Sequence, residues 1–159
     1  MFLLLGLLRK LVVPVVLLLG LIQLVPYGRA HSNPAPTKTA RFTSAAARQI
    51  VANACADCHS YRTTWPWYTN VAPVSWLVQN DVDGGRRALN FSRWDTAQPA
   101  LAVVVDKVSS DEMPPLKYKL MPNHAKARLS DAEKRRLIAG LRQLYAADPP
   151  ASIRRGRRE

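Results

Sequence analysis

The stretch Cys55-Ala56-Asp57-Cys58-His59 lies in the first half of the 159-residue chain and contains both of its cysteines. Cys55 and Cys58 are three residues apart, so on a helix their thiols fall on the same face, about one turn apart. His59 follows four residues after Cys55 and falls on that face as well. The three side chains can therefore reach one bound group from the same side.

Cys-x-x-Cys-His is the attachment signature of a c-type haem. The thiols of Cys55 and Cys58 can form thioethers with the two vinyl groups of one porphyrin, and His59 can then present its imidazole to the iron. The spacing predicts one covalent haem c, held by Cys55 and Cys58, with His59 as the proximal iron ligand. Three other interpretations stay open: a redox disulfide, a zinc site that also uses His31 or His124, and a stretch without function.

The residues before and after this pentad predict helices rather than strands. Ser44 is typical of an N-cap, and apolar residues at every third or fourth position predict a helix from there to the cysteines. The aromatic, proline-containing stretch 61–73 predicts a loop. A short helix is then expected over 74–82, closed by Gly84-Gly85.

Two more helices are expected in the second half of the chain. One is predicted over 96–108, where Pro99 falls in the first turn. The other begins after the capping box Ser130-Asp-Ala-Glu133 and ends before Pro149. Because no alternating strand pattern appears, the predicted fold class is all-α, with long loops and one bound group at its centre.

The N-terminal part of the chain is its most apolar region. Between Phe2 and Val25 the only charged residues are Arg9 and Lys10. Residues 11–25 alone would rise about 22 Å as a helix, whereas all of 2–25 would rise about 36 Å, enough for a hydrocarbon core of about 30 Å. A signal peptide cut before His31 is the alternative. The expected organisation is a transmembrane anchor over 1–27, a linker over 28–43, a haem-binding domain over 44–148 and a basic tail over 149–159.

Short motifs besides the pentad run through almost the whole chain: Leu21-Ile-Gln-Leu-Val-Pro26, Trp65-Pro-Trp-Tyr68, Ala72-Pro-Val-Ser-Trp76, Leu89-Asn-Phe-Ser92 and Glu112-Met-Pro-Pro115. With these motifs the chain resembles the bacterial haem-binding domain proteins, small membrane-anchored relatives of class I cytochrome c. The resemblance implies a c-type haem in a cytochrome c-like helical domain, preceded by one N-terminal membrane-spanning helix. It also implies a single-pass protein of the bacterial inner membrane, with the haem domain in the periplasm, and it implies no particular reaction.

The sixth ligand of the iron has three candidates in the chain. Met113 stands 54 residues after His59. The following Pro114-Pro115 predicts an extended loop that could carry its sulfur across the haem. We therefore predict Met113 as the distal ligand, with Met121, His124 or an open, water-filled position as alternatives.

Aromatic and basic side chains are concentrated just after the pentad. Buried Trp N–H and Tyr O–H groups need acceptors, and haem propionates provide them. The aromatic residues are nevertheless expected mainly to pack in the core, and a propionate held by one of Tyr61, Arg62, Trp65 and Trp67 is the alternative.

The chain is strongly basic, with 23 Lys and Arg against 11 Asp and Glu and a formal net charge of +12. This charge predicts attraction to the inner membrane surface or to an acidic redox partner protein. Nucleic acid is not an expected partner, because the basic residues are not interleaved with aromatic ones. The predicted function is a membrane-anchored monohaem cytochrome that carries electrons and is not an enzyme. A haem-based redox or small-ligand sensor is the alternative.

Overall fold

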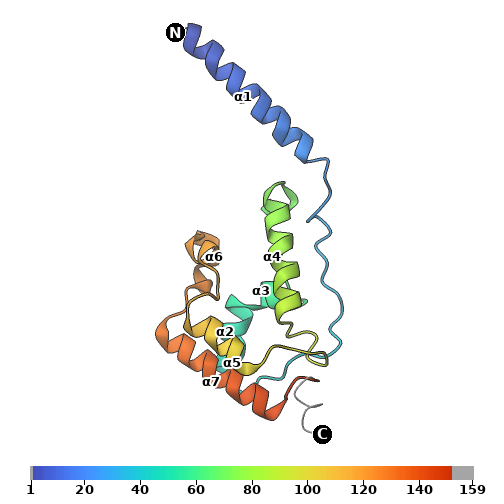
Figure 1. Ribbon diagram of the computed structural model, residues 1–159, viewed down its shortest axis with the longest axis vertical. Helices are drawn as coiled ribbons and strands as arrows, with labels where there is room; N and C mark the ends of the chain where they lie inside the picture. The colour runs from blue at the N-terminus through green and yellow to red at the C-terminus, as the bar shows by residue number, and fades with distance from the viewer. Residues whose placement is uncertain (1, 152–159) are drawn as a thin grey trace. The chain divides into compact units, whose positions relative to one another are not determined.

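The computed structural model describes residues 2–151, and nine helical elements follow one another in this part of the chain (Figure 1). Within it, the only β-type pairing is an isolated bridge between Lys38 and Arg93. The all-α class is therefore right, while most of the predicted basic tail, from residue 152 onward, lies outside the described residues. The elements are α1 (Phe2–Ile22), α2 (Ala45–Ala54), α3 (Ala56–His59), the 3₁₀-helix η1 (Trp67–Asn70), α4 (Val74–Ala88), α5 (Leu101–Ser109), α6 (Leu116–Leu120), the 3₁₀-helix η2 (Pro122–Ala127) and α7 (Asp131–Ala147).

The predicted membrane-spanning helix is wrong, and with it the predicted single-pass location in the inner membrane. Among the described residues, no helix combines the length and the apolar character that a membrane span requires. α1 forms where the anchor was expected, but it contains Arg9 and Lys10 and ends at Ile22. Its uncharged part, from Leu11 to Ile22, rises about 18 Å, well below the hydrocarbon thickness of about 30 Å.

The chain divides into two compact units, Met1–Ser32 with Trp65–Asp81 and Asn33–Thr64 with Val82–Glu159. In the first unit, the Gln23 side chain donates to the carbonyl of Ala72 and accepts from its N–H, at 2.9 and 3.0 Å. Gly28 has a φ of 82°, and a Cβ there would overlap the carbonyl of Ser75. Only glycine combines this left-handed backbone with such a close approach.

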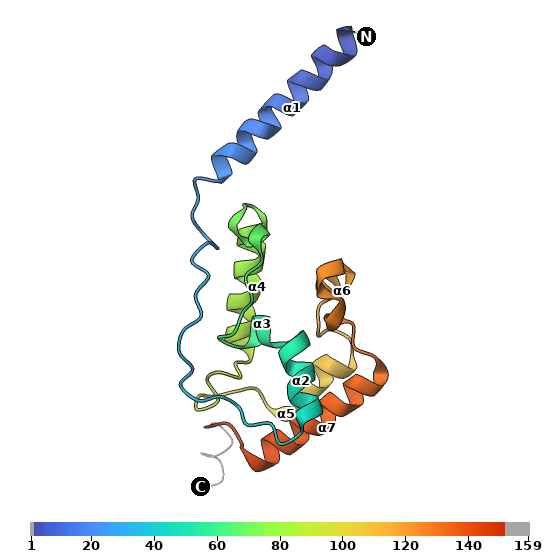
Figure 2. The ribbon, with the colours of Figure 1, turned by 180° about the vertical axis from the view of Figure 1, so that it is seen from behind.

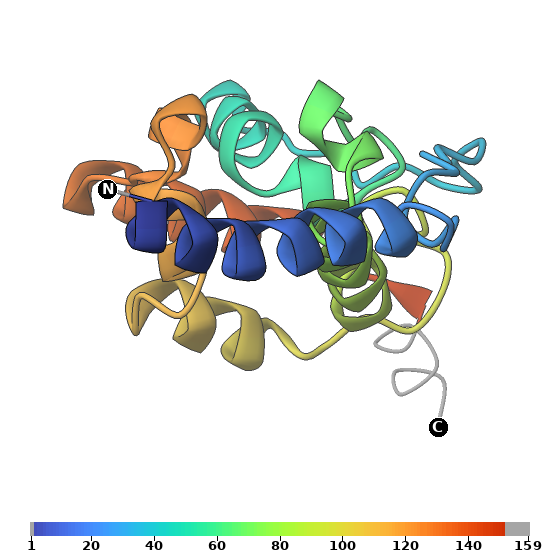
Figure 3. The same cartoon turned by 90° about the horizontal axis from the view of Figure 1, so that it is seen from above.

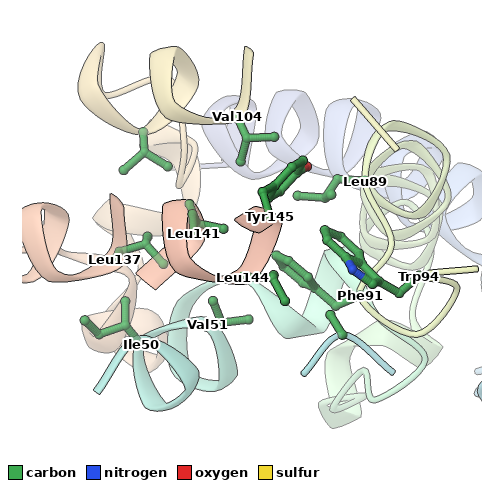
Figure 4. Packing of buried hydrophobic residues seen from close by; sticks show 12 residues of the cluster. Ile50, Val51, Leu89, Phe91, Trp94, Val104, Leu137, Leu141, Leu144 and Tyr145 are labelled. Atoms are coloured by element: carbon green, nitrogen blue, oxygen red, sulfur yellow. The ribbon is translucent and has the colours of Figure 1, made fainter. Parts of the chain in front are cut away.

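The second unit is built around α7. Helices α2 and α5 both pack against it (Figures 1 and 2), and the view from above shows them on different sides of α7 (Figure 3). Apolar side chains from all three helices and from the loop after α4 meet between them (Figure 4). The fully enclosed members of this core include Trp94, Leu137, Leu141 and Leu144.

Local capping signals define where α2 and α7 begin. The Ser44 hydroxyl accepts from the N–H of Ala47 at 3.2 Å. At α7 the predicted capping box is present, with the Ser130 hydroxyl accepting from the Glu133 N–H and the Glu133 carboxylate accepting from the Ser130 N–H. Both predicted helix starts are confirmed, because the signals that set them lie within three residues of the cap.

Other helix boundaries differ from the prediction. α4 continues past Gly84-Gly85 to Ala88, and α5 begins at Leu101 instead of residue 96. In the loop before α5, the Gln98 side chain accepts from the N–H of Asn90 at 2.9 Å and donates to the carbonyl of Arg93 at 2.9 Å. These bonds hold residues 90–98 in a non-helical loop.

The segment before α2 is bound to the loop after α4. The N–H groups of Thr37 and Ala40 donate to the carbonyls of Ser92 and Phe91, and the N–H of Trp94 donates to the carbonyl of Lys38. The same loop reaches the end of the pentad, because the N–H of Phe91 donates to the carbonyl of His59 at 2.8 Å. Residues 91–94 thus join the approach to α2 with the exit from α3.

Candidate haem site

The pentad forms a separate turn after α2. Cys55 ends α2 with a φ of −126° and begins α3, so the predicted single helix up to the cysteines is broken there. The N–H groups of Cys58 and His59 donate to the carbonyl of Cys55, at 3.2 and 2.9 Å. This turn keeps the i, i+3 relation of the two thiols, which form no disulfide with each other.

The imidazole of His59 is held by two backbone carbonyls. Its Nδ1 lies 3.0 Å from the oxygen of Gly85 and 3.0 Å from the oxygen of Leu89. Carbonyl oxygens can only accept, so Nδ1 carries the proton and Nε2 presents its lone pair. Burial lowers the pKa of His59, and the two carbonyl hydrogen bonds oppose this effect. The ring is therefore neutral and fixed in orientation, as a metal-ligating imidazole must be.

The cysteine environment favours attachment over redox exchange. Burial, together with the neighbouring Cys58, raises the pKa of the Cys55 thiol to about 12. A thiol of this kind is protonated at neutral pH, whereas a redox-active Cys-x-x-Cys motif needs a stabilised thiolate. Zinc is also disfavoured, since the described residues contain no group of three or more His, Cys, Asp or Glu side chains able to hold a metal ion. The donor set of Cys55, Cys58 and His59 fits a c-type haem.

Arg86 fixes the loop that leaves the pentad. Its Nε donates to the carbonyl of Ser60 at 2.9 Å, and its Nη2 donates to Asn33 Oδ1 and Thr63 Oγ1 at 2.9 and 3.0 Å. The guanidinium also lies 5.1 Å from the ring centre of Tyr61. Arg86 is the residue after Gly85, so one turn of α4 contacts both the imidazole of His59 and the loop 60–63 that follows the pentad.

The three candidates for the distal ligand lie on the stretch between α5 and α7. Met113 follows α5, and its N–H donates to the carbonyl of Lys107 at 2.9 Å. Met113 is 37% exposed and Met121 is 41% exposed, so neither methionine fills the core. Their exposure therefore does not favour one over the other as the iron ligand. The His124 ring packs edge-on against Tyr118, with 5.0 Å between ring centres. In the described chain, α6 packs on η2 and η2 packs on α2, but neither element packs on α3, which carries His59. The packing therefore brings none of the three candidates to the pentad, and Met113 stays a prediction.

The candidate propionate anchors belong to both compact units, Tyr61 and Arg62 to the second and Trp65 and Trp67 to the first. Tyr61 lies under Arg86, and Arg62 and Trp67 are exposed, Trp67 by 78%. Trp65 stacks on His31, with 4.7 Å between ring centres, and its buried indole N–H makes no hydrogen bond in the described part of the chain. Trp65 is thus the candidate whose N–H needs an acceptor, and its role stays a prediction.

The fixed imidazole and the two cysteines of the same turn point to the class of haem-binding proteins. The family model described as the haem-binding domain matches residues 17–143, which is most of the chain. The chain therefore belongs to the haem-binding domain family, as its resemblance in sequence predicted. No curated protein and no solved structure matches it significantly.

Sequence reasoning missed the residues that hold His59. Gly85 and Leu89 act through backbone carbonyls, which leave no signature of side-chain chemistry. The available signal was Gly84-Gly85 itself, since a glycine inside a helical pattern often marks close packing instead of a helix end. Asn33 and Arg86 were missed because they meet only in the folded chain.

Proposed function

We propose that the chain carries one haem c, attached through Cys55 and Cys58 and ligated by His59, and that it transfers single electrons through this haem. The observation that supports the proposal most directly is the pair of 3.0 Å hydrogen bonds from His59 Nδ1 to the carbonyls of Gly85 and Leu89. They leave Nε2 as the ligating atom and fix the plane of the ring. Such support from outside the ligand shell is a common feature of metal-bound histidines.

The bound haem supplies a one-electron ferric–ferrous couple. The chain's own residues hold that couple in a constant environment: the thiols of Cys55 and Cys58 fix the ring position, and α4 fixes the imidazole. In this proposal Met113 would also ligate the iron, because a thioether favours ferrous iron and gives the higher potentials of electron carriers. With His59 and Met113 both bound to the iron, no iron position would be left for a substrate, so the proposed role is that of a carrier and not of an enzyme. The net charge of +12 makes an acidic redox protein the proposed partner.

The attachment is tested by mass under denaturing conditions, on protein produced together with a haem c attachment system. Each thiol adds its sulfur and its hydrogen across one vinyl double bond, so the chain should gain the full mass of one haem. Acidified acetone should not extract the haem. The double variant Cys55→Ala, Cys58→Ala is the control and should have the mass of the bare chain. A wild-type chain at its bare mass would show the proposal to be wrong.

The carrier role is tested by absorption spectra of the purified haem protein in both oxidation states. A carrier should be six-coordinate and low-spin as ferric and as ferrous protein. Five-coordinate ferrous haem that binds carbon monoxide at once would contradict the carrier role and support the sensor instead.

A further inference from the structure

We infer that Gly85 is a positioning residue for the haem iron, because its missing side chain lets α4 approach the pentad closely enough to hold the imidazole of His59. The inference rests on the proposed function, in which His59 ligates the iron. In addition, α4 sets how strongly the His59 imidazole donates electrons to the iron, and Gly85 is the residue that lets α4 come close enough to do so.

The contact between Gly85 and Cys58 has no room for a side chain. A Cβ at position 85 would lie 2.9 Å from the carbonyl carbon and 2.9 Å from the Cβ of Cys58, and closer still to its carbonyl oxygen. These are backbone and near-backbone atoms of a residue proposed to be tethered to the haem, so they cannot swing aside as a long side chain can. Any larger residue must therefore push α4 and the pentad apart.

Gly84, one residue earlier in the same helix, has no such neighbour. The nearest atom to a Cβ at position 84 is Arg87 Nη2, at 3.9 Å, which is ordinary van der Waals contact with a flexible side chain. Both glycines lie inside α4, and neither has a left-handed backbone. Gly84→Ala thus makes the same chemical change as Gly85→Ala, with the same gain in helix propensity, but without the steric overlap.

The close approach of α4 also affects how strongly the His59 imidazole donates electrons, because the carbonyl of Gly85 is one of the two that accept its Nδ1 proton. A hydrogen bond at Nδ1 makes the imidazole a stronger electron donor through Nε2 and so favours ferric iron. When α4 moves away, both 3.0 Å bonds lengthen, the imidazole donates less, and ferrous iron gains in relative stability. The reduction potential should therefore rise.

The test compares wild type, Gly84→Ala and Gly85→Ala, all as haem-loaded protein, in a redox titration with mediator dyes. At the solution potential where wild type is half reduced, we expect the ratio of reduced to oxidised Gly85→Ala to be about tenfold higher, and Gly84→Ala to match wild type. When Met113→Ala is added to each of the three proteins, so that the ferrous haem becomes five-coordinate, the iron–histidine stretching band should move to lower frequency with Gly85→Ala alone. Equal potentials in the two variants would overturn the inference and leave the proposed function intact, whereas a wild-type chain without covalent haem would overturn both.

If Gly85→Ala yields no haem protein, a second measurement on wild type tests whether α4 holds the His59 imidazole. In ¹⁵N-histidine-labelled wild type, the His59 Nδ1 proton should exchange with solvent at least about a hundredfold more slowly than an exposed imidazole N–H, because the carbonyls of Gly85 and Leu89 hold it. Slow exchange supports the inference. Exchange at the rate of an exposed ring would show that α4 does not hold the imidazole, and the inference would be wrong.

Discussion

Gly140 of α7 lies directly against Ala47 of α2, and a Cβ at position 140 would overlap the Cβ of Ala47. Both residues are buried, and they bring the helix that leads to the pentad into direct contact with the helix at the centre of the core. The separation of α2 and α7 is therefore set by the absence of a single methyl group.

Gly140→Ala should lower the free energy of unfolding by about 1 kcal/mol. The overlap with Ala47 costs about 1–3 kcal/mol, and it outweighs the gain of about 1 kcal/mol that alanine brings to a helix interior. Denaturant unfolding followed by circular dichroism measures the change.

The double variant Ala47→Gly, Gly140→Ala serves as the control, since it moves the methyl group from one helix to the other. It should recover part of the loss, which appears as a favourable coupling energy in the double-mutant cycle. Additive losses would show that the two residues are not in contact.

Ser130→Ala should cost about 1 kcal/mol of stability, because it removes the N-cap of α7. The hydroxyl accepts from the Glu133 N–H at 3.3 Å and donates to the Glu133 carboxylate at 2.7 Å. Ser109→Ala is the comparison: that hydroxyl only bonds back to carbonyls of its own helix, at Val105 and Asp106, so its loss should be nearly neutral. Thermal unfolding of both variants measures the difference, and equal melting temperatures would contradict the role of the cap.

Stability should fall at alkaline pH because of Tyr145. Its hydroxyl donates to the carbonyl of Pro99 at 2.9 Å, and burial raises the pKa of Tyr145 to about 12 from the ordinary value of 10.0. Below pH 10 the phenol is neutral in the folded and the unfolded chain. Between pH 10 and 12 only the unfolded chain loses the proton, so stability should decrease by about 2 kcal/mol across this range.

This alkaline loss is measured as the difference in unfolding free energy between wild type and Tyr145→Phe at pH 9 and at pH 11.5. The difference should shrink as the pH rises, because phenylalanine has no proton to lose. A pH-independent difference for Tyr145→Phe would mean that its phenol ionises equally in both states.

Met113→Ala and Met121→Ala should separate the two exposed methionines. If Met113 ligates the iron, its loss should abolish the weak far-red sulfur-to-iron absorption band of the ferric protein, lower the potential and permit rapid binding of carbon monoxide to the ferrous protein. Met121→Ala should change none of these properties. An exchange of the two phenotypes would make Met121 the ligand, and two silent variants would leave His124 or an open position.

The parts of the fold that the sequence predicted well are those that neighbouring residues determine. Ser44 and the Ser130–Glu133 box act over three residues, so α2 and α7 begin where they were expected. The pentad likewise carries its spacing within five residues. Its identification as a haem-binding sequence needed no tertiary information, and the family match agrees with it.

The parts that were mispredicted depend on residues far apart in the sequence. Gly85 looked like a helix end because its contact with Cys58, which requires a glycine, spans 27 positions. Helices α6 and η2 were missed because they are too short to show an apolar period. The N-terminal helix was judged on its composition over 2–25, whereas α1 ends at Ile22.

The hold of α4 on His59 has a consequence for the order of assembly. The two thiols are brought together by a single turn, but the bonds from His59 to Gly85 and Leu89 close loops of 26 and 30 residues. Forming such loops costs chain entropy and comes later than the local turn. In the proposed haem protein, the two thiols can therefore be joined to the haem before the rest of the chain folds. The absorption spectrum of the haem would then change when α4 packs against His59, and so report the folding of the remaining chain.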